Sequence, residues 1–348
     1  MKKNILSLCA FALAIISFSC SGEVKQNQIV VMQFNLWQEG TIIEGGFDGI
    51  VDEIIASDAD FVALSEVRNY DETRFCDKLT QALKKKGHTY YSFLSHDTGM
   101  LSRTPITDSS EVFAWSKQTD AGSVHRLLTT VYGKEVAFYT AHLDYRSCAY
   151  YDVRGYGGSS WNEREPLTDV DEVIAINQAS KRDDAVIDFI EFAKNDIAAN
   201  RIVIVGGDYN EPSHLDWIDE TKNMRDHQGL VVPWDVSLLL EKAGYKDSYR
   251  EIYPDPVTHP GFTYPANAQG AAINKLTWAP KADERERIDY IHYYPNESLE
   301  LVSTTIVAPK GDIYRAQRDT TSSADPLRLP VGIWPTDHKA LVTIFAVK

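Results

Sequence analysis

Six apolar segments of the sequence end in, or lead into, side chains that bind metal ions or move protons. Each segment is apolar enough to form a buried strand, and would carry its polar residues to the edge of a sheet. Taken one at a time, these residues are better explained as turn caps or solvated carboxylates. As a set they indicate a site, because ligands bind at strand ends in layered α/β folds. The residues are Asn35, Glu66, His142, Asp208, Asn210, Asp289, Asp337 and His338.

The oxygen-rich character of this set indicates a hard divalent cation. Carboxylate and amide oxygens, without thiolates or a cage of histidines, suit Mg²⁺, Mn²⁺ or Ca²⁺. Such a cation neutralises charge on phosphate oxygens during ester hydrolysis. In the segment `IVIVGGDYNEPS` (202–213), Asp208 would then orient and activate the attacking water, and Asn210 would hold a phosphate oxygen or the metal shell. A histidine paired with a carboxylate would stay protonated against the phosphoryl oxygens.

Strands that alternate with helices and hairpins predict one α/β domain of layered mixed sheets over residues 28–348. No segment within this range has the composition of a linker. Helical spacing predicts helices over 47–58 and 72–87 and a single long helix over about 169–198. The predicted strands are 28–37, 59–67, 89–94, 98–103, 109–115, 124–133, 134–145, 201–207, 286–294, 299–308 and 338–348.

Residues 1–19 are typical of a secretory signal. Two lysines precede a short apolar run that ends in small residues and Cys20. The run is too short to span a membrane comfortably, and its end resembles a bacterial lipobox, in which the cysteine is acylated. We expect an exported lipoprotein, anchored to a membrane through Cys20, with a tether at residues 20–27. An ordinary cleaved signal with an incidental cysteine is the alternative.

The net charge of −15 argues against long DNA or RNA as a partner, since nucleic-acid affinity depends on Lys and Arg neutralising phosphates. Small substrates or short polar headgroups fit better. Beyond the signal region and Cys20, Cys76 and Cys148 remain. An exported protein permits a disulfide between them, and two separate buried thiols are an equal alternative. The chain carries no signal of oligomerisation, and we expect a monomer.

Six motifs in a fixed order resemble the endonuclease/exonuclease/phosphatase superfamily, in particular its deoxyribonuclease and sphingomyelinase branches. They are `FNLW`, `LSEV`, `HLDY`, `GDYNEP`, `RIDYI` and `TDHKALV`. The resemblance covers essentially residues 28–348. It implies a four-layered α/β sandwich, with two packed mixed β-sheets flanked by helices. It also implies a divalent-metal-dependent hydrolase of phosphoric esters, with Mg²⁺, or Mn²⁺ or Ca²⁺, as the cofactor.

The resemblance also implies a role for each matching residue. Glu66 corresponds to the principal metal ligand and Asn35 to its neighbour, while Asp337 would lie at the metal or just behind it. The implied catalytic residues are Asp208 as the activator of water with Asn210 beside it, His338 at the scissile phosphate with Asp289 as its carboxylate partner, and His142 as the donor of a proton to the leaving group.

The substrate is less constrained than the reaction. His142 favours a phosphodiester over a phosphomonoester, because a poor alkoxide leaving group needs a proton. Arg126 is a weaker candidate for a phosphate contact. The Tyr- and Gly-rich segment 145–166 includes Tyr145 and Trp161, whose faces would suit a sugar, a nucleobase or a choline-like cation. An ordinary ordered surface loop explains it equally well. We therefore expect a small, lipid or sugar phosphoester.

Other functions compete with this hypothesis. A nuclease of the same superfamily would use the same residues. A glycosidase would use Glu66 and Asp208 as its carboxylate pair, but it gives the two histidine motifs no role. A non-catalytic binding lipoprotein on the same fold would be favoured by loss of Glu66, Asp208 or His338, and all three are present.

Overall fold

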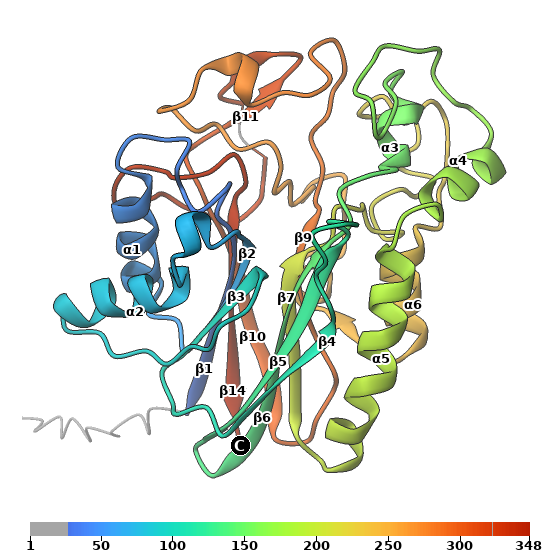
Figure 1. Ribbon diagram of the computed structural model, residues 1–348. Coiled ribbons are helices and arrows are strands. Elements are labelled where there is room, and N and C mark those ends of the chain that lie inside the picture. Colours follow the sequence, from blue (N-terminus) through green and yellow to red (C-terminus); the bar gives the residue numbers. More distant parts are fainter. Residues whose placement is uncertain (1–26, 322) are drawn as a thin grey trace, which may run out of the picture.

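The computed structural model describes residues 27–321 and 323–348. Two mixed sheets of six strands each pack face to face, and helices cover their outer faces (Figure 1). The first sheet is covered by α1 and α2, and the second by α5 and α6. The four-layered α/β sandwich expected from the sequence is confirmed.

The first sheet has the strand order β13-β10-β14-β1-β2-β3. Its strands β1 and β2 are parallel, and Asn35 at the end of β1 lies opposite Ser65 on β2. The polar ends of these two strands therefore share one edge of the sheet. The bounds are β1 Gln28–Asn35, β2 Phe61–Val67, β3 Asp97–Ser102, β10 Leu299–Val307, β13 Leu327–Arg328 and β14 Ala340–Val347.

The second sheet has the order β4-β5-β6-β7-β9-β8. Its register brings three predicted site residues side by side. His142 on β6 is opposite Asp208 on β7, and Asp208 is opposite Asp289 on β9. The bounds are β4 Asp108–Phe113, β5 Gly122–Val131, β6 Lys134–Leu143, β7 Ile202–Asp208, β8 Lys246–Asp247 and β9 Asp289–Tyr293.

The helices and the remaining short elements connect and cover these sheets. The helices are α1 Gly46–Ser57, α2 Phe75–Lys85, α3 Ala149–Val153, α4 Val170–Asn177, α5 Arg182–Ala198, α6 Asp235–Lys242 and α7 Ser248–Ile252. Two 3₁₀ turns span Tyr70–Glu72 and Ile273–Lys275, and a two-stranded ribbon pairs β11 Asp312–Tyr314 with β12 Gln317–Asp319.

The two sheets approach closely near the polar strand ends because Gly206 has no side chain. A Cβ at Gly206 would lie 3.0 Å from the Cβ of Ala63 on β2, which is tighter than ordinary van der Waals contact. Further from that edge, large apolar side chains such as Phe61 and Phe138 fill the interface, with ring centroids 5.1 Å apart. The glycine thus brings the polar ends of the two sheets together.

Two predicted elements are wrong. The segment 89–94 is not a strand, because only Tyr91 pairs with a neighbouring strand residue, Ser102, in a single bridge. The adjacent Tyr90 is held by its side chain, whose hydroxyl donates to the Ala59 carbonyl. The long helix over 169–198 is two helices, α4 and α5. The chain breaks between them because the Asp144 carboxylate accepts the Lys181 N–H at 3.1 Å, a tertiary contact that the local sequence does not signal.

The predicted signal over 1–19, the acylated Cys20 and most of the tether lie outside the described residues. Within the described part of the chain, none of the helices combines the length and the apolar character needed to cross a membrane. Cys76 and Cys148 are buried free thiols and form no disulfide with each other.

Candidate active site

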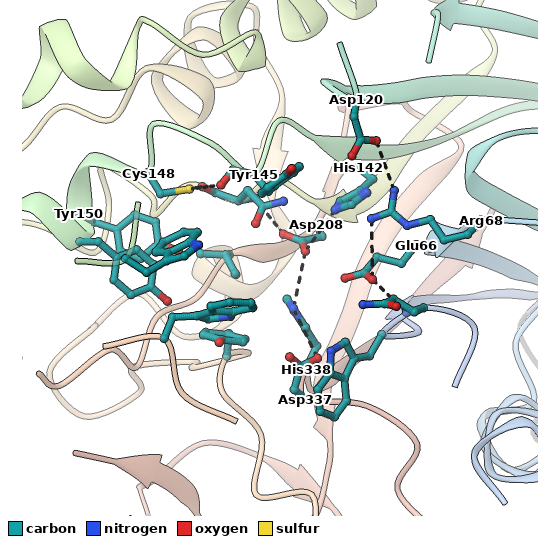
Figure 2. A pocket seen from close by; sticks show the side chains of 18 residues that line it. Glu66, Arg68, Asp120, His142, Tyr145, Cys148, Tyr150, Asp208, Asp337 and His338 are labelled. Atoms are coloured by element: carbon teal, nitrogen blue, oxygen red, sulfur yellow. Dashed lines mark hydrogen bonds and ion pairs between the residues drawn. The ribbon is translucent and has the colours of Figure 1, made fainter. Parts of the chain in front are cut away.

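Asp208 lies at the centre of a pocket at the polar edge of the sandwich, between two imidazole rings (Figure 2). Its Oδ2 is 3.9 Å from Nε2 of His142 and 3.8 Å from Nε2 of His338. His142 comes from β6 of the second sheet, and His338 from the loop before β14 of the first sheet. The site is therefore assembled from both sheets.

Each histidine is held by its own buried aspartate. Nδ1 of His338 is 2.9 Å from Asp289, and Nδ1 of His142 is 2.9 Å from Asp97. Burial alone would lower the pKa of His338, but the carboxylates of Asp289 and Asp208 raise it to about 10. In the same way, Asp97 and Asp208 outweigh burial and raise the pKa of His142 to about 9. These pKa shifts favour the protonated form of both rings at neutral pH, the form that can donate a proton.

The Asp208 carboxylate is poised to exchange a proton. Its Oδ2 accepts the Asn35 amide at 2.8 Å, and its Oδ1 accepts the Asn210 N–H at 2.9 Å. Burial and the charge of Asp289 raise the pKa of Asp208 to about 6, against the opposing effect of the two histidines. A carboxylate with this pKa is mostly ionised at pH 7 and basic enough to take a proton from water.

Glu66 and Asp337 bring two further carboxylates to the pocket. Glu66 has φ 65° and lies at a β-bulge between β2 and β3, a device that redirects a side chain out of the sheet pattern. Its Oε2 accepts the Gln38 N–H at 2.9 Å. Burial raises the pKa of Asp337 to about 7, with His338 opposing and the charge of Glu66 adding to the rise. Two repelling carboxylates that face one pocket fit a hard divalent cation.

Among the described residues, the ligand atoms of another group, Asp208, Asp289 and His338, lie within 4.8 Å of one another. The carboxylate oxygens of this group already accept hydrogen bonds. Asp289 accepts the Gln33 amide through Oδ1 at 2.8 Å and the His338 ring through Oδ2. The cationic His338 would have to lose its proton to bind a metal. Glu66 and Asp337 therefore offer the better place for a cation.

The structure brings Asn35 and Asn210 to Asp208. Asn35 is fully buried, and its amide oxygen accepts the Trp37 N–H at 2.8 Å while its amide nitrogen bonds Asp208. Asn210 lines the pocket with φ 51°, and its amide bonds the Leu143 carbonyl at 3.0 Å. Both residues orient the central carboxylate. A metal-binding role for Asn35 stays a prediction.

The predicted phosphate contact of Arg126 is wrong. The residue lies on β5 and points to the helix-covered face of the second sheet, away from the pocket. Its guanidinium is 3.2 Å from the fully buried Asp196 of α5 and also bonds Asp108. Sequence reasoning chose Arg126 for its strand, but strand alternation turns its side chain away from the site.

Tyr145 and Trp161 do line the pocket, a cavity of about 270 Å³. Sequence reasoning missed other residues there or directly behind it, among them Arg68, Asp97, Asp120 and Trp278. Asp97 had a usable signal. It begins a strand that runs antiparallel to β2, and the start of such a strand lies beside the end of its neighbour. Arg68 bonds Asp97 and lies 3.6 Å from Asp120.

Comparisons with known proteins agree with this fold. A family model described as "Endonuclease/Exonuclease/phosphatase family" matches residues 32–338. An uncharacterized protein of Caenorhabditis elegans is 28% identical over 347 residues, covering 94% of this chain and 96% of that protein.

Solved structures share the fold at low sequence identity. D. rerio TDP2 complexed with a single-strand DNA product superposes with a TM-score of 0.53 at 15% identity, covering 92% of this chain and 99% of that chain. The human Nocturnin catalytic domain with a bound sulfate anion gives a TM-score of 0.52 at 16% identity, covering 92% and 95%.

Proposed function

Because the chain belongs to the endonuclease/exonuclease/phosphatase family, we propose that it is a divalent-metal-dependent phosphoesterase that hydrolyses a small phosphodiester by direct attack of water. One observation carries the proposal. A single carboxylate, Asp208, lies between two cationic histidines, each paired with its own buried aspartate. This arrangement has both a base for water and proton donors for phosphate oxygens.

The residues divide the work as follows. Asp208 accepts a proton from the water whose oxygen forms the new bond to phosphorus. His338 donates a hydrogen bond to a non-bridging phosphate oxygen, and Asp289 keeps its ring oriented and charged. His142, supported by Asp97, gives its proton to the oxygen of the leaving group as the P–O bond breaks.

The cation would be held by Glu66 and Asp337. When bound, a hard divalent cation supplies charge neutralisation at the phosphate oxygens. Mg²⁺ is our first expectation, with Mn²⁺ and Ca²⁺ as alternatives, because the ligands on offer are carboxylate oxygens.

The test is hydrolysis of bis(p-nitrophenyl) phosphate and p-nitrophenyl phosphate by the purified protein. Each ester is assayed with EDTA and then with Mg²⁺, Mn²⁺ or Ca²⁺ restored. We expect cleavage that needs the metal and falls by about 10²–10⁴-fold in Asp208→Ala and in His338→Ala. Faster turnover of the diester would support His142 as the acid. Activity that survives EDTA, or that is near normal in both variants, would contradict the proposal.

We also propose that the protein is exported and anchored to a membrane through an acylated Cys20, and that it acts as a monomer on a small, lipid or sugar phosphoester rather than on long nucleic acid. The support is the sequence of residues 1–20 and the net charge of −15. Metabolic labelling with a radioactive fatty acid tests the anchor, and Cys20→Ser should abolish the label.

A further inference from the structure

The pocket continues beyond the catalytic residues into a wall of aromatic side chains. Figure 2 shows Tyr150 and Cys148 on one side of Asp208, and Glu66, Arg68 and Asp120 on the other. We use the name aromatic subsite for the five rings that line the first side: Tyr145, Tyr150, Tyr151, Trp161 and Trp278.

Four of these rings pack in one continuous chain. The ring centroids of Tyr150 and Tyr151 are 4.6 Å apart, and those of Tyr151 and Trp161 are 4.9 Å apart at an angle of 76°. Trp161 then contacts Trp278 at 5.4 Å. At the mouth, Tyr145 is 40% exposed and Trp278 is 49% exposed. Aromatic surface left uncovered beside a catalytic pocket is typical of a binding site.

Internal bonds fix the aromatic subsite in place. The buried Glu284 accepts the Tyr151 hydroxyl at 3.3 Å and the Trp278 N–H at 3.0 Å, and so ties the two sides of the wall together. The Cys148 thiol lies 3.4 Å from the Asn210 carbonyl, two residues from Asp208. The wall is therefore preorganised at a set distance from the reacting centre, which lowers the entropic cost of binding.

The rings of the aromatic subsite carry no charge of their own. Burial raises the pKa of Cys148 to about 12 and the pKa of Tyr150 and Tyr151 well above the ordinary value of 10.0, so these groups stay neutral. Among the described residues that line the pocket, Arg68 is the single Lys or Arg, and it lies on the opposite side in a bond with Asp97. Arg146 lies 5.5 Å from the centroid of the Tyr145 ring, but its guanidinium is paired with the Asp144 carboxylate at 2.8 Å and so is not free for a second phosphate on the substrate.

We propose that the aromatic subsite binds an uncharged ring, a nucleobase or a sugar, that is attached to the scissile phosphate. This inference rests on the proposed phosphoesterase function. The guanidinium of Arg146 already lies over the Tyr145 ring, 5.5 Å from its centroid, and this makes that face less favourable for an organic cation. A ring that stacks on Trp278 or Tyr145 gains dispersion attraction and removes water from both faces, as bases and sugars do on aromatic side chains.

Three p-nitrophenyl diesters with the same leaving group test the proposal: those of thymidine 5′-phosphate, phosphorylcholine and methyl phosphate. With the full chain and Mg²⁺, we expect kcat/KM for the thymidine ester to exceed that of the methyl ester about tenfold, the size of one stacked ring. Trp278→Ala should bring this ratio close to one. The matched control is Tyr132→Ala, an exposed tyrosine in the β5–β6 turn at the far end of the strands, which should leave the ratio unchanged.

Preference for the choline ester, or a thymidine-to-methyl ratio that Trp278→Ala does not alter, would overturn the proposal. If no ester is cleaved, the proposed phosphoesterase function is wrong. The aromatic subsite is then tested separately, by a binding measurement. Tryptophan fluorescence of the metal-free protein is then titrated with thymidine 5′-phosphate and with glucose 6-phosphate. Saturable quenching that is lost in Trp278→Ala supports binding of an uncharged ring at the aromatic subsite. The ligand that binds more tightly shows whether the subsite prefers a nucleobase or a sugar. Absence of saturable quenching by both ligands overturns it.

Discussion

At the scale of single residues, the unusual feature is that two histidine–aspartate pairs face one carboxylate. The pairs make the rings more basic, while burial and Asp289 make Asp208 less acidic than an ordinary aspartate. Environments that push titratable groups apart in this way assign the acid and the base of a reaction.

The first prediction is a bell-shaped dependence of kcat/KM on pH. Activity should rise through about pH 6 as Asp208 loses its proton, and fall above about pH 9 as His142 loses its own. The measurement is a pH profile of diester hydrolysis at saturating metal. His142→Gln should lower the rate and move the alkaline fall up toward pH 10, where His338 loses its proton. An alkaline fall that persists unchanged in this variant would give the acid role to another group.

The second prediction concerns the metal. Glu66→Gln should raise the Mg²⁺ concentration needed for half-maximal activity at least tenfold, since a neutral amide replaces one of two carboxylates that face the cation. Asp289→Asn is the matched comparison, because the Asp289 carboxylate already accepts hydrogen bonds from Gln33 and His338 and is not expected to bind the cation. It should lower kcat with little change in the Mg²⁺ requirement. The reverse pattern would move the cation to Asp208, Asp289 and His338.

Sequence reasoning located the strand-end residues but not their partners. His142, Asp208 and Asp289 were predictable because each follows or begins an apolar strand. Asp97 was missed because its importance arises from the antiparallel pairing of β3 with β2. Arg126 was misjudged for a related reason, since the direction of a strand side chain depends on which face of the sheet is buried against α5.

At the scale of elements, the start of α5 joins the Tyr- and Gly-rich segment 145–166 to the second sheet. Arg182, the first residue of α5, is fully buried and pairs with Glu211 at 3.1 Å. Its guanidinium also donates to the carbonyls of Asp144 at 2.7 Å and Ser147 at 2.9 Å. One side chain therefore ties a helix, the segment after β6 and the segment after β7.

The third prediction follows from this junction. Arg182→Met should destabilise the protein by about 3–5 kcal/mol, because it leaves the buried Glu211 carboxylate without its cation. Urea denaturation followed by circular dichroism measures the change. Lys181→Ala is the control: its ion pair with Asp184 is exposed, and the urea midpoint should not move. Equal effects of the two substitutions would show that burial of the Arg182 pair does not matter.

The same junction explains why the helix prediction over 169–198 was wrong. Residues 178–181 contain neither Gly nor Pro, and the helical pattern continues through them. The break is imposed by Asp144, which lies far away in the sequence at the end of β6 and accepts the Lys181 N–H. A contact of this kind becomes visible only when the strands have been placed.

At the scale of the whole molecule, buried ion pairs hold the late segments of the chain against the rest. Glu286 bonds the buried Arg154 and accepts the Trp217 indole N–H at 3.0 Å. Burial alone would raise the pKa of Glu286, but Arg154 and His227 lower it to about 2. The carboxylate is thus bound as an anion in the folded state.

The fourth prediction is loss of stability in acid. Since the pKa of Glu286 in the folded state is below its ordinary value of 4.5, its contribution is complete above about pH 4.5 and is lost as the pH falls toward 2. Asp247, whose pKa Arg287 lowers to about 2 against the effect of burial, acts in the same direction. Urea midpoints at pH 6 and pH 3 should differ less in Glu286→Gln than in the unaltered chain. An identical difference would contradict the assignment.

The layered fold was predictable as a whole because strand and helix patterns alternate along the chain. The spacing between the layers was not. It depends on Gly206 facing Ala63 across the two sheets, and a glycine in a strand can equally signal a bulge or a turn.

The position of β14 has a consequence for the order of events during synthesis. This strand lies between β10 and β1, in the middle of the first sheet, although it is formed by residues 340–347. While a ribosome is still making it, β1 lacks one neighbour and His338 has no strand to hold it beside Asp289. A chain that has not yet added residues 340–347 therefore lacks the strand that fixes His338 beside Asp289. The candidate site is thus completed in one step, when β14 joins the sheet, rather than strand by strand as the chain emerges.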